Sequence, residues 1–163
     1  MIVYLIRHGK SQRQSASGRD EDRALVQQGK RQAAWLGEQL DGSNGFLSPQ
    51  ILLVSGYVRA WQTAELIQVR TAGQLLTAPE LEPGHDKGDV MRLVDHAVHE
   101  QTPNAIALVG HNPMMEYLIC ALTGQRSLDE IEMRTGTAAA IEIAPEAIAL
   151  GAGKLVTKLR RDD

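Results

Sequence analysis

Three short runs of uninterrupted apolar residues constrain the fold of this chain most strongly. They cover Ile2–Ile6, Ile51–Val54 and Ala105–Val109. Such runs are typical of strands buried on both faces, because a strand with one solvent-facing side alternates apolar and polar residues. The chain is therefore expected to contain a largely parallel sheet that is covered by helices on both faces.

The segments between these runs supply the helices and the remaining strands. Apolar residues recur at helical spacing in four segments, Val26–Leu40, Val58–Val69, Val90–His99 and Pro113–Leu122. Further strands are expected at Gln74–Thr77, Ala138–Ile143 and Lys154–Leu159. The last two strands are close in sequence and could pair antiparallel at one edge. This pattern predicts an α/β fold, a three-layer αβα sandwich with a mostly parallel central sheet. A length of 163 residues suits a single domain spanning 1–163, since domains commonly contain about 100–200 residues.

The composition of the chain excludes several functional classes. The 17 Lys and Arg residues stand against 20 Asp and Glu residues, and the net charge of −3 argues against a general nucleic-acid binder. Cys120 is the single cysteine, so neither an intrachain disulfide nor a cysteine-based zinc site can form. No apolar run approaches the ~18 residues of a membrane helix, and no signal-peptide pattern follows Met1. We expect a cytoplasmic protein that binds neither nucleic acid nor membranes.

Cationic and imidazole side chains follow each of the three buried strands. Arg7 and His8 come directly after the first strand, and His111 comes shortly after the third. Arg59 lies in the first turn of the helix that follows the second strand. In open α/β sheets ligands bind at the carboxyl ends of the strands. These four side chains are therefore expected to meet at one edge of the sheet.

The residues around this edge suit a phosphate group. Pro113 is expected to open a helix with Asn112 as its N-cap, and Ser55 is expected to cap the helix after the second strand. Both helix N-termini would then direct free N–H groups and the positive ends of their dipoles at the same place. Gly9 and Gly110 would let a ligand approach the backbone closely. The planar fork of arginine binds phosphate oxygens in pairs.

Other known ligand-binding motifs are missing. The sequence has no GxxxxGK[ST] loop, no GxGxxG after the first strand and no GxSxG elbow. His96 and His99 do not complete a zinc-binding pattern, so no metal site is expected. The Ser-rich and charged segment Lys10–Arg23 is expected to be an exposed loop, which either rims the site or is a solvated connection.

Four segments, in order along the chain, resemble the motifs of the histidine phosphatase superfamily, whose fold is phosphoglycerate-mutase-like. They are Leu5–Ser11 with its Arg-His-Gly, Leu25–Ala33, Val54–Ala64 and Val109–Pro113. Within the superfamily, the small size and the Pro79–Pro83 loop without a large lid insertion resemble the SixA-type phosphohistidine phosphatases.

The resemblance implies a catalytic site and a reaction. His8 would be the nucleophile that is transiently phosphorylated, with Arg7, Arg59 and a protonated His111 holding the phosphate oxygens. Substrate-binding roles of lower specificity would fall to Gly9, Ser11 and Asn112. The expected reaction removes phosphate from phosphohistidine on a partner protein, such as a phosphotransfer domain, and releases inorganic phosphate without a cofactor or a metal.

The general acid is the main departure from the superfamily pattern. Members that cleave phosphate monoesters usually have a Glu two residues after the Leu that matches Leu81, where this chain has Pro83. Glu82 could substitute, or the labile P–N bond of phosphohistidine could make a strong acid unnecessary. Two alternatives stay open: a metal-independent phosphatase of small phosphate monoesters, and a non-catalytic phospho-binding module. The retention of His8 argues against the second alternative.

Overall fold

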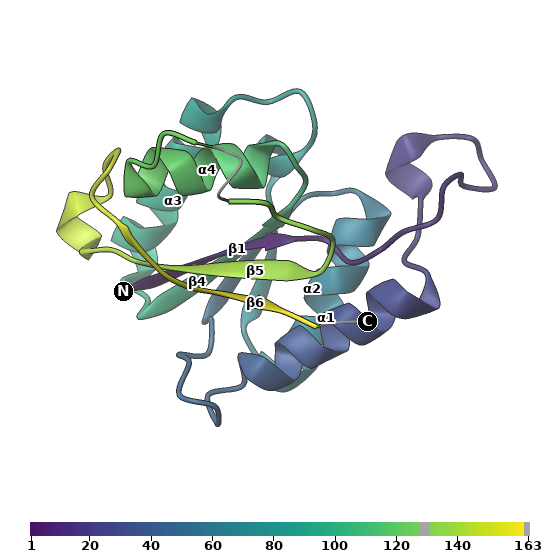
Figure 1. Cartoon of the computed structure of the whole chain (residues 1–163), viewed down its shortest axis with the longest axis horizontal. Helices are drawn as coiled ribbons and strands as arrows, with labels where there is room; N and C mark the ends of the chain where they lie inside the picture. Colours follow the sequence, from purple (N-terminus) through teal and green to yellow (C-terminus); the bar gives the residue numbers. More distant parts are fainter. Residues whose placement is uncertain (128–130, 162–163) are drawn as a thin grey trace.

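The computed structural model describes residues 1–127 and 131–161, and its centre is a mixed β-sheet (Figure 1). Within the described residues the strands lie in the order β3-β2-β4-β1-β5-β6. Their bounds are Ile2–Arg7 for β1, Ile51–Val54 for β2, Gln74–Thr77 for β3, Ala105–Gly110 for β4, Thr137–Glu142 for β5 and Lys154–Arg160 for β6.

The strands on the β3 side of the sheet are parallel, and the strands on the β6 side are antiparallel. β4 pairs in parallel with both β1 and β2, and β2 pairs in parallel with β3. β5 runs antiparallel to β1, and β6 runs antiparallel to β5. The antiparallel pairing of the last two strands is therefore confirmed. In register, Arg7 of β1 is opposite Gly110 of β4, so the residues that follow these two strands start at the same level.

Helices cover both faces of the sheet, which confirms the three-layer αβα arrangement. α1 (Gln27–Gln39) and α2 (Val58–Thr71) pack on one face, and α3 (Lys87–Gln101) and α4 (Met114–Thr123) pack on the other (Figure 1). Successive strand residues point to opposite faces. Leu5 is accordingly buried in the core with α3 and α4, and Ile6 in the core with α1 and α2. None of the helices in the described ranges is long and apolar enough to span a bilayer.

One helix start and two helix caps differ from their sequence predictions. α3 begins three residues before Val90, because the Asp86 side chain accepts from Gly88 N and Asp89 N in a capping box that the apolar spacing does not reveal. The predicted caps at Asn112 and Ser55 are wrong. α4 and α2 have Pro113 and Tyr57 at their N-cap positions without a side-chain cap bond.

Local hydrogen bonds explain both wrong caps. Asn112 Nδ2 donates instead to Glu116 Oε1 at 2.6 Å and to the carbonyl of Met133 at 2.9 Å. The hydroxyl of Ser55 lies 2.8 Å from His111 Nε2. Both side chains therefore stabilise the strand-end loops rather than the first turn of a helix.

The segment Lys10–Arg23 follows β1, and four of its residues line a polar cavity at the carboxyl ends of the strands: Lys10, Ser11, Asp20 and Arg23. The base of the segment is closed by a β-bridge between Ser11 and Leu25. Near its end it forms a single turn of 3-10 helix, η1 (Asp20–Asp22), which packs near α2. The segment therefore rims the site and is not merely a solvated connection.

Candidate active site

A polar cavity of about 400 Å³ opens at the carboxyl ends of β1, β2 and β4. It brings together the four side chains that the sequence predicted to meet, Arg7, His8, Arg59 and His111. The loop after β1 and the neighbouring loops complete its lining with Lys10, Ser11, Asp20, Arg23, Pro83, Asn112 and Thr135. We call this cavity the phosphate pocket, after the ligand that the sequence predicts for it.

His8 is buried, and its ring is held as a neutral imidazole. Its Nδ1 lies 2.7 Å from the carbonyl oxygen of Gly9, and because a carbonyl can only accept, Nδ1 carries the proton. Burial lowers the pKa of His8 to about 4, and the charges of Arg59 and Arg7 act in the same direction. The lone pair of His8 is therefore on Nε2 at neutral pH, which is the state that a nucleophile needs.

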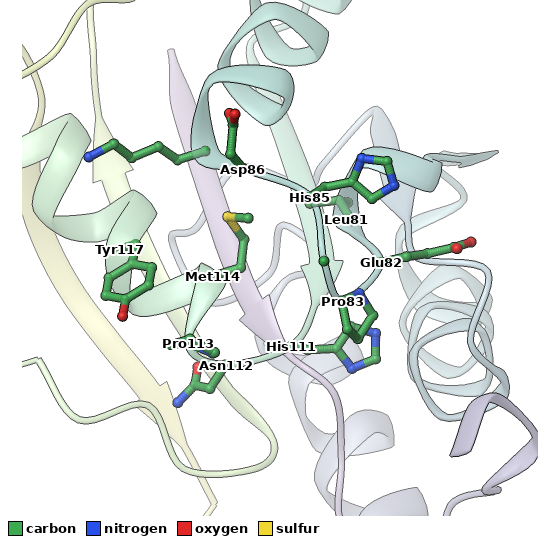
Figure 2. Close-up of a pocket in the computed structure, with 12 residues that line it drawn as sticks. Leu81, Glu82, Pro83, His85, Asp86, His111, Asn112, Pro113, Met114 and Tyr117 are labelled. Carbon is green, nitrogen blue, oxygen red and sulfur yellow. The ribbon is translucent and has the colours of Figure 1, made fainter. Parts of the chain in front are cut away.

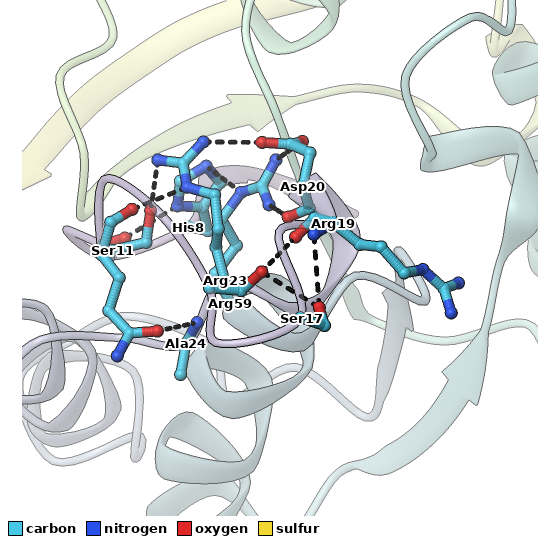
Figure 3. Close-up of polar contacts among 11 residues, drawn as sticks. His8, Ser11, Ser17, Arg19, Asp20, Arg23, Ala24 and Arg59 are labelled. Carbon is cyan, nitrogen blue, oxygen red and sulfur yellow. Dashed lines mark hydrogen bonds and ion pairs between the residues drawn. The ribbon is translucent and has the colours of Figure 1, made fainter.

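Arg59 projects from the first turn of α2 and contacts His8 directly. Its Nε donates to His8 Nε2 at 3.2 Å (Figure 3). Nη1 donates to the carbonyl oxygen of Asp20 at 2.7 Å, and Nη2 donates to Asp20 Oδ2 at 2.9 Å. The guanidinium carbon also lies 5.0 Å from the ring centroid of Tyr57, within cation–π range.

Burial favours the neutral form of His111 in the free site, and its protonation with phosphate bound stays a prediction. Burial, together with the neighbouring His8 and Arg59, lowers its pKa to about 3. The ring centroids of His8 and His111 are 5.0 Å apart. The hydroxyl of Ser55 can donate to His111 Nε2, which would leave the ring proton on Nδ1.

Two buried nitrogens at this site have no hydrogen-bond partner among the described residues, Arg7 Nε and His111 Nδ1. Arg7 is anchored by Nη1, which donates to the carbonyl of Met133 at 2.7 Å. Unpaired buried donors are costly unless a ligand satisfies them. An oxyanion would satisfy both, and the arginines that line the pocket would neutralise its charge. No group of three or more His, Cys, Asp or Glu residues within the described ranges is placed to hold a metal ion.

Of the three predicted substrate-binding residues, Ser11 and Asn112 line the phosphate pocket. The hydroxyl of Ser11 accepts from Arg23 Nη2 at 3.1 Å. The need for glycine at position 9 comes from packing rather than from a ligand, because a Cβ there would lie 2.5 Å from the carbonyl oxygen of Gly29. At Gly110 a Cβ would lie 2.9 Å from Met115 Cε.

Glu82 lines a second cavity, of about 510 Å³, which adjoins the phosphate pocket (Figure 2). Apolar side chains make up much of its wall, among them Leu81, Pro83, Pro113, Met114 and Tyr117. Pro83, His111 and Asn112 line both cavities. The Glu82 carboxylate is directed toward Gly56, where a Cβ would lie 2.6 Å from Oε1. The role of Glu82 as a general acid stays a prediction.

Three residues at the site were not singled out from the sequence. Thr63 is buried in α2, where its hydroxyl donates to the carbonyl of Arg59 at 2.7 Å and accepts from Gly9 N at 3.0 Å. Its position one helical turn after Arg59 is a signal that could have revealed it. Asp20 and Arg23 carried no such signal, because they lie in a loop without periodicity.

The sequence motifs and the fold define the class of this protein. The family description "Histidine phosphatase superfamily (branch 1)" matches residues 3–84, which is half of the chain. The chain therefore belongs to the histidine phosphatase superfamily. No significant match was found among curated proteins.

Solved structures of several phosphatases share this fold. The protein histidine phosphatase SixA complexed with tungstate is 23% identical, with a TM-score of 0.83 over 98% of this chain and 97% of that chain. The α-ribazole phosphatase from Shigella flexneri is 21% identical, with a TM-score of 0.70 over 95% of this chain and 94% of that chain. A mycobacterial glucosyl-3-phosphoglycerate phosphatase complexed with VO3 is 16% identical, with a TM-score of 0.72 over 96% and 97%. At these identities the likeness shows the fold alone.

Proposed function

We propose that this protein removes phosphate from phosphohistidine on a partner protein, through a phospho-His8 intermediate. The observation that carries the proposal is the state of His8, a buried neutral imidazole whose Nε2 lone pair lies in an arginine-lined pocket. A site that only bound phosphate would need the arginines but not a nucleophile among them.

The reaction runs in two displacements at phosphorus. His8 Nε2 forms a bond to phosphorus as the P–N bond to the substrate imidazole breaks. If the other nitrogen of the substrate ring is protonated, the ring departs as neutral imidazole and takes the electron pair of the broken bond. Water then attacks the phosphorus of phospho-His8, so that inorganic phosphate leaves and His8 is restored.

The side chains around His8 act on the charge of the transferring group. Phosphoryl transfer has a loose transition state with charge on three equatorial oxygens, so positioning and electrostatic stabilisation dominate its catalysis. Arg7 and Arg59 supply fixed positive charge, and His111 supplies an N–H donor or, with a phosphate dianion bound, a positive charge. In the proposed mechanism these side chains do the electrostatic work, and it needs no cofactor.

Two observations favour phosphohistidine over a phosphate ester. Pro83 lies at the wall of the phosphate pocket, and it cannot protonate the oxygen of a leaving alcohol. The adjoining cavity of about 510 Å³ is open to the surface at the half-exposed Tyr117, so a residue on a protein surface could approach through it. The fold likeness to SixA supports the same reading.

Small phosphate monoesters are the second candidate substrate class. The likeness to the α-ribazole and glucosyl-3-phosphoglycerate phosphatases favours it, as does the presence of Glu82 next to Pro83. A rotation of Glu82 toward the phosphate pocket would supply the acid that an alkoxide leaving group needs. In that case Glu82→Gln should lower turnover of monoesters strongly.

A comparison of phosphate release tests the proposal. The protein is given a histidine-phosphorylated phosphotransfer protein and a panel of small phosphate monoesters, with His8→Ala as the control. We expect kcat/KM to be highest for the phosphoprotein, and release to depend on His8. Faster turnover of a monoester, with loss on Glu82→Gln, would replace this proposal with the second candidate.

A further inference from the structure

The carboxylate of Asp20 is bound by two arginines of the phosphate pocket (Figure 3). Oδ2 accepts from Arg59 Nη2 at 2.9 Å, and Oδ1 accepts from Arg23 Nη1 at 2.7 Å. The side chain of Arg59 is 6% exposed, whereas that of Asp20 is 55% exposed. The hydrogen bond from Arg23, with those from Arg59, lowers the pKa of Asp20 below its usual value, so the group is an anion at neutral pH.

Each nitrogen of Arg59 donates one hydrogen bond. Nη1 and Nη2 both donate to Asp20, and Nε donates to His8 Nε2. The Asp20 carboxylate holds an N–H of Nη2, and a phosphate that binds the guanidinium side-on beside His8 would use Nε–H and Nη2–H. The two anions therefore compete for Nη2. The lone pair of His8 is covered by Arg59 Nε–H, and this bond must also break before Nε2 can reach phosphorus.

We infer that Asp20 is a positioning residue that acts through Arg59, as an internal anionic ligand that a phosphoryl group must displace. This inference rests on the proposed function in taking a phosphoryl group as the competitor. A phosphate dianion carries more charge than the carboxylate and is favoured by the same cations. Asp20 therefore sets how tightly the pocket holds the substrate phosphoryl group and the phosphate product.

Arg23 can stay in place when Asp20 leaves. Its Nε donates to the carbonyl of Gln12 at 2.6 Å, and its Nη2 donates to Ser11 Oγ. After displacement of Asp20, Arg23 Nη1 is available to the ligand. Asp20 itself is free to move outward because it belongs to a single exposed turn, η1, that buries none of its residues.

The two neighbouring acids in η1 do not share this role. Glu21 accepts from Arg19 Nε, and Asp22 Oδ2 accepts from the hydroxyl of Ser17 at 2.6 Å. Neither residue lines the phosphate pocket. Asp22 is therefore a matched control for Asp20, with the same side chain, the same turn and no contact with Arg59 in the described structure.

Titration calorimetry with inorganic phosphate at pH 7.5 tests the inference. We expect Asp20→Asn to lower the dissociation constant about fivefold, since the lost ion pair is partly exposed. The KM for the phosphorylated substrate should fall with it. Asp20→Glu should return both values toward those of the unmodified protein, and Asp22→Asn should leave them unchanged.

Other outcomes overturn the inference. Phosphate binding that is unchanged or weaker in a folded Asp20→Asn protein would show that Asp20 does not compete. If Asp22→Asn lowered the dissociation constant for phosphate as much as Asp20→Asn, the effect would come from the net charge of the turn and not from the contact with Arg59. Phosphate binding requires no turnover, so this result is independent of the substrate comparison above. If the phosphoprotein is not a substrate but Asp20→Asn still tightens phosphate binding, only the proposed function fails. Should Asp20→Asn fail to fold, Asp20→Ala gives the same readout.

Discussion

Two buried histidines are kept neutral next to several arginines. His8 and His111 lie at the ends of adjacent strands, and burial lowers both of their pKa values, to about 4 and about 3. A charged imidazole would lose hydration and face Arg59 at the same time. Burying a neutral ring costs less free energy than burying a charged one, and in the proposed mechanism a neutral His8 attacks without first losing a proton.

This pair of histidines makes folding sensitive to acid. The histidines of the unfolded chain become protonated below a pH of about 6.5, whereas the folded protein keeps them neutral down to about pH 4. The unfolded state therefore binds more protons between these two pH values. Stability therefore rises with pH through this window and is lost as the pH falls. We expect the free energy of unfolding to drop by about 3 kcal/mol for each histidine, since a shift of about two pKa units corresponds to about 3 kcal/mol.

Urea unfolding at pH 7.5, 6.0 and 4.5 measures this loss in the phosphate-free protein. His111→Gln keeps a polar side chain but removes one titrating group, so its stability should vary less with pH than that of the unmodified protein. The same pH dependence in both proteins would contradict the assignment of a low pKa to His111.

At the residue scale, the sequence was sufficient to predict which side chains meet in the pocket, but not their protonation states. Arg7, His8, Arg59 and His111 could be predicted because each has a fixed offset from a buried strand. The neutral state of His111 could not, because it follows from how deeply the fold buries the ring. The role of Asp20 depends on how an irregular loop folds. Because three acidic residues are consecutive there, the sequence does not indicate which of them contacts Arg59.

At the scale of secondary structure, the connection between α2 and the end of β1 positions the site. Thr63 accepts from Gly9 N and donates to the carbonyl of Arg59, so a single hydroxyl joins the loop that carries His8 to the helix that carries Arg59. It is fully buried, so no water can replace it. We expect this bond to fix the distance between His8 and Arg59.

Replacing Thr63 with Val should disturb both stability and catalysis. The buried N–H of Gly9 would lose its partner, at a cost of about 1–3 kcal/mol in the free energy of unfolding. Thr63→Ser keeps the hydroxyl and should retain most of kcat/KM, whereas Thr63→Val should lower it well beyond the loss in folded fraction. Thr71→Val, which removes a similar hydroxyl bond to Ile67 at the other end of α2, is the control. Equal kinetics for Thr63→Val and Thr71→Val would rule out a positioning role.

The pattern of apolar residues predicted the positions of the strands and helices, but it did not predict where each of them ends. All six described strands and all four described α-helices lie where the patterns predict them, with ends that differ by a few residues. The start of α3 was missed because a capping box acts through polar residues. The caps predicted at Asn112 and Ser55 failed because those side chains found closer partners, Glu116 and His111.

At the scale of the whole molecule, three parallel neighbouring strands bring distant parts of the chain to one pocket. β1, β4 and β2 are adjacent, so residues near positions 8, 59 and 111 converge although they are widely separated in sequence. The antiparallel strands β5 and β6 extend the sheet on the other side. This arrangement explains why the motifs of the histidine phosphatase superfamily, taken in order, predict one site.

Trapping of the phosphorylated protein tests the central claim most directly. The protein is mixed with a ³²P-labelled histidine-phosphorylated protein, quenched within the first turnover and separated under denaturing conditions. We predict label on this chain that is lost in acid and kept in base, as a phosphorus–nitrogen bond requires, and that is absent in His8→Ala. Phosphate release without such a label, or a label that persists in His8→Ala, would contradict the assignment of His8 as the nucleophile.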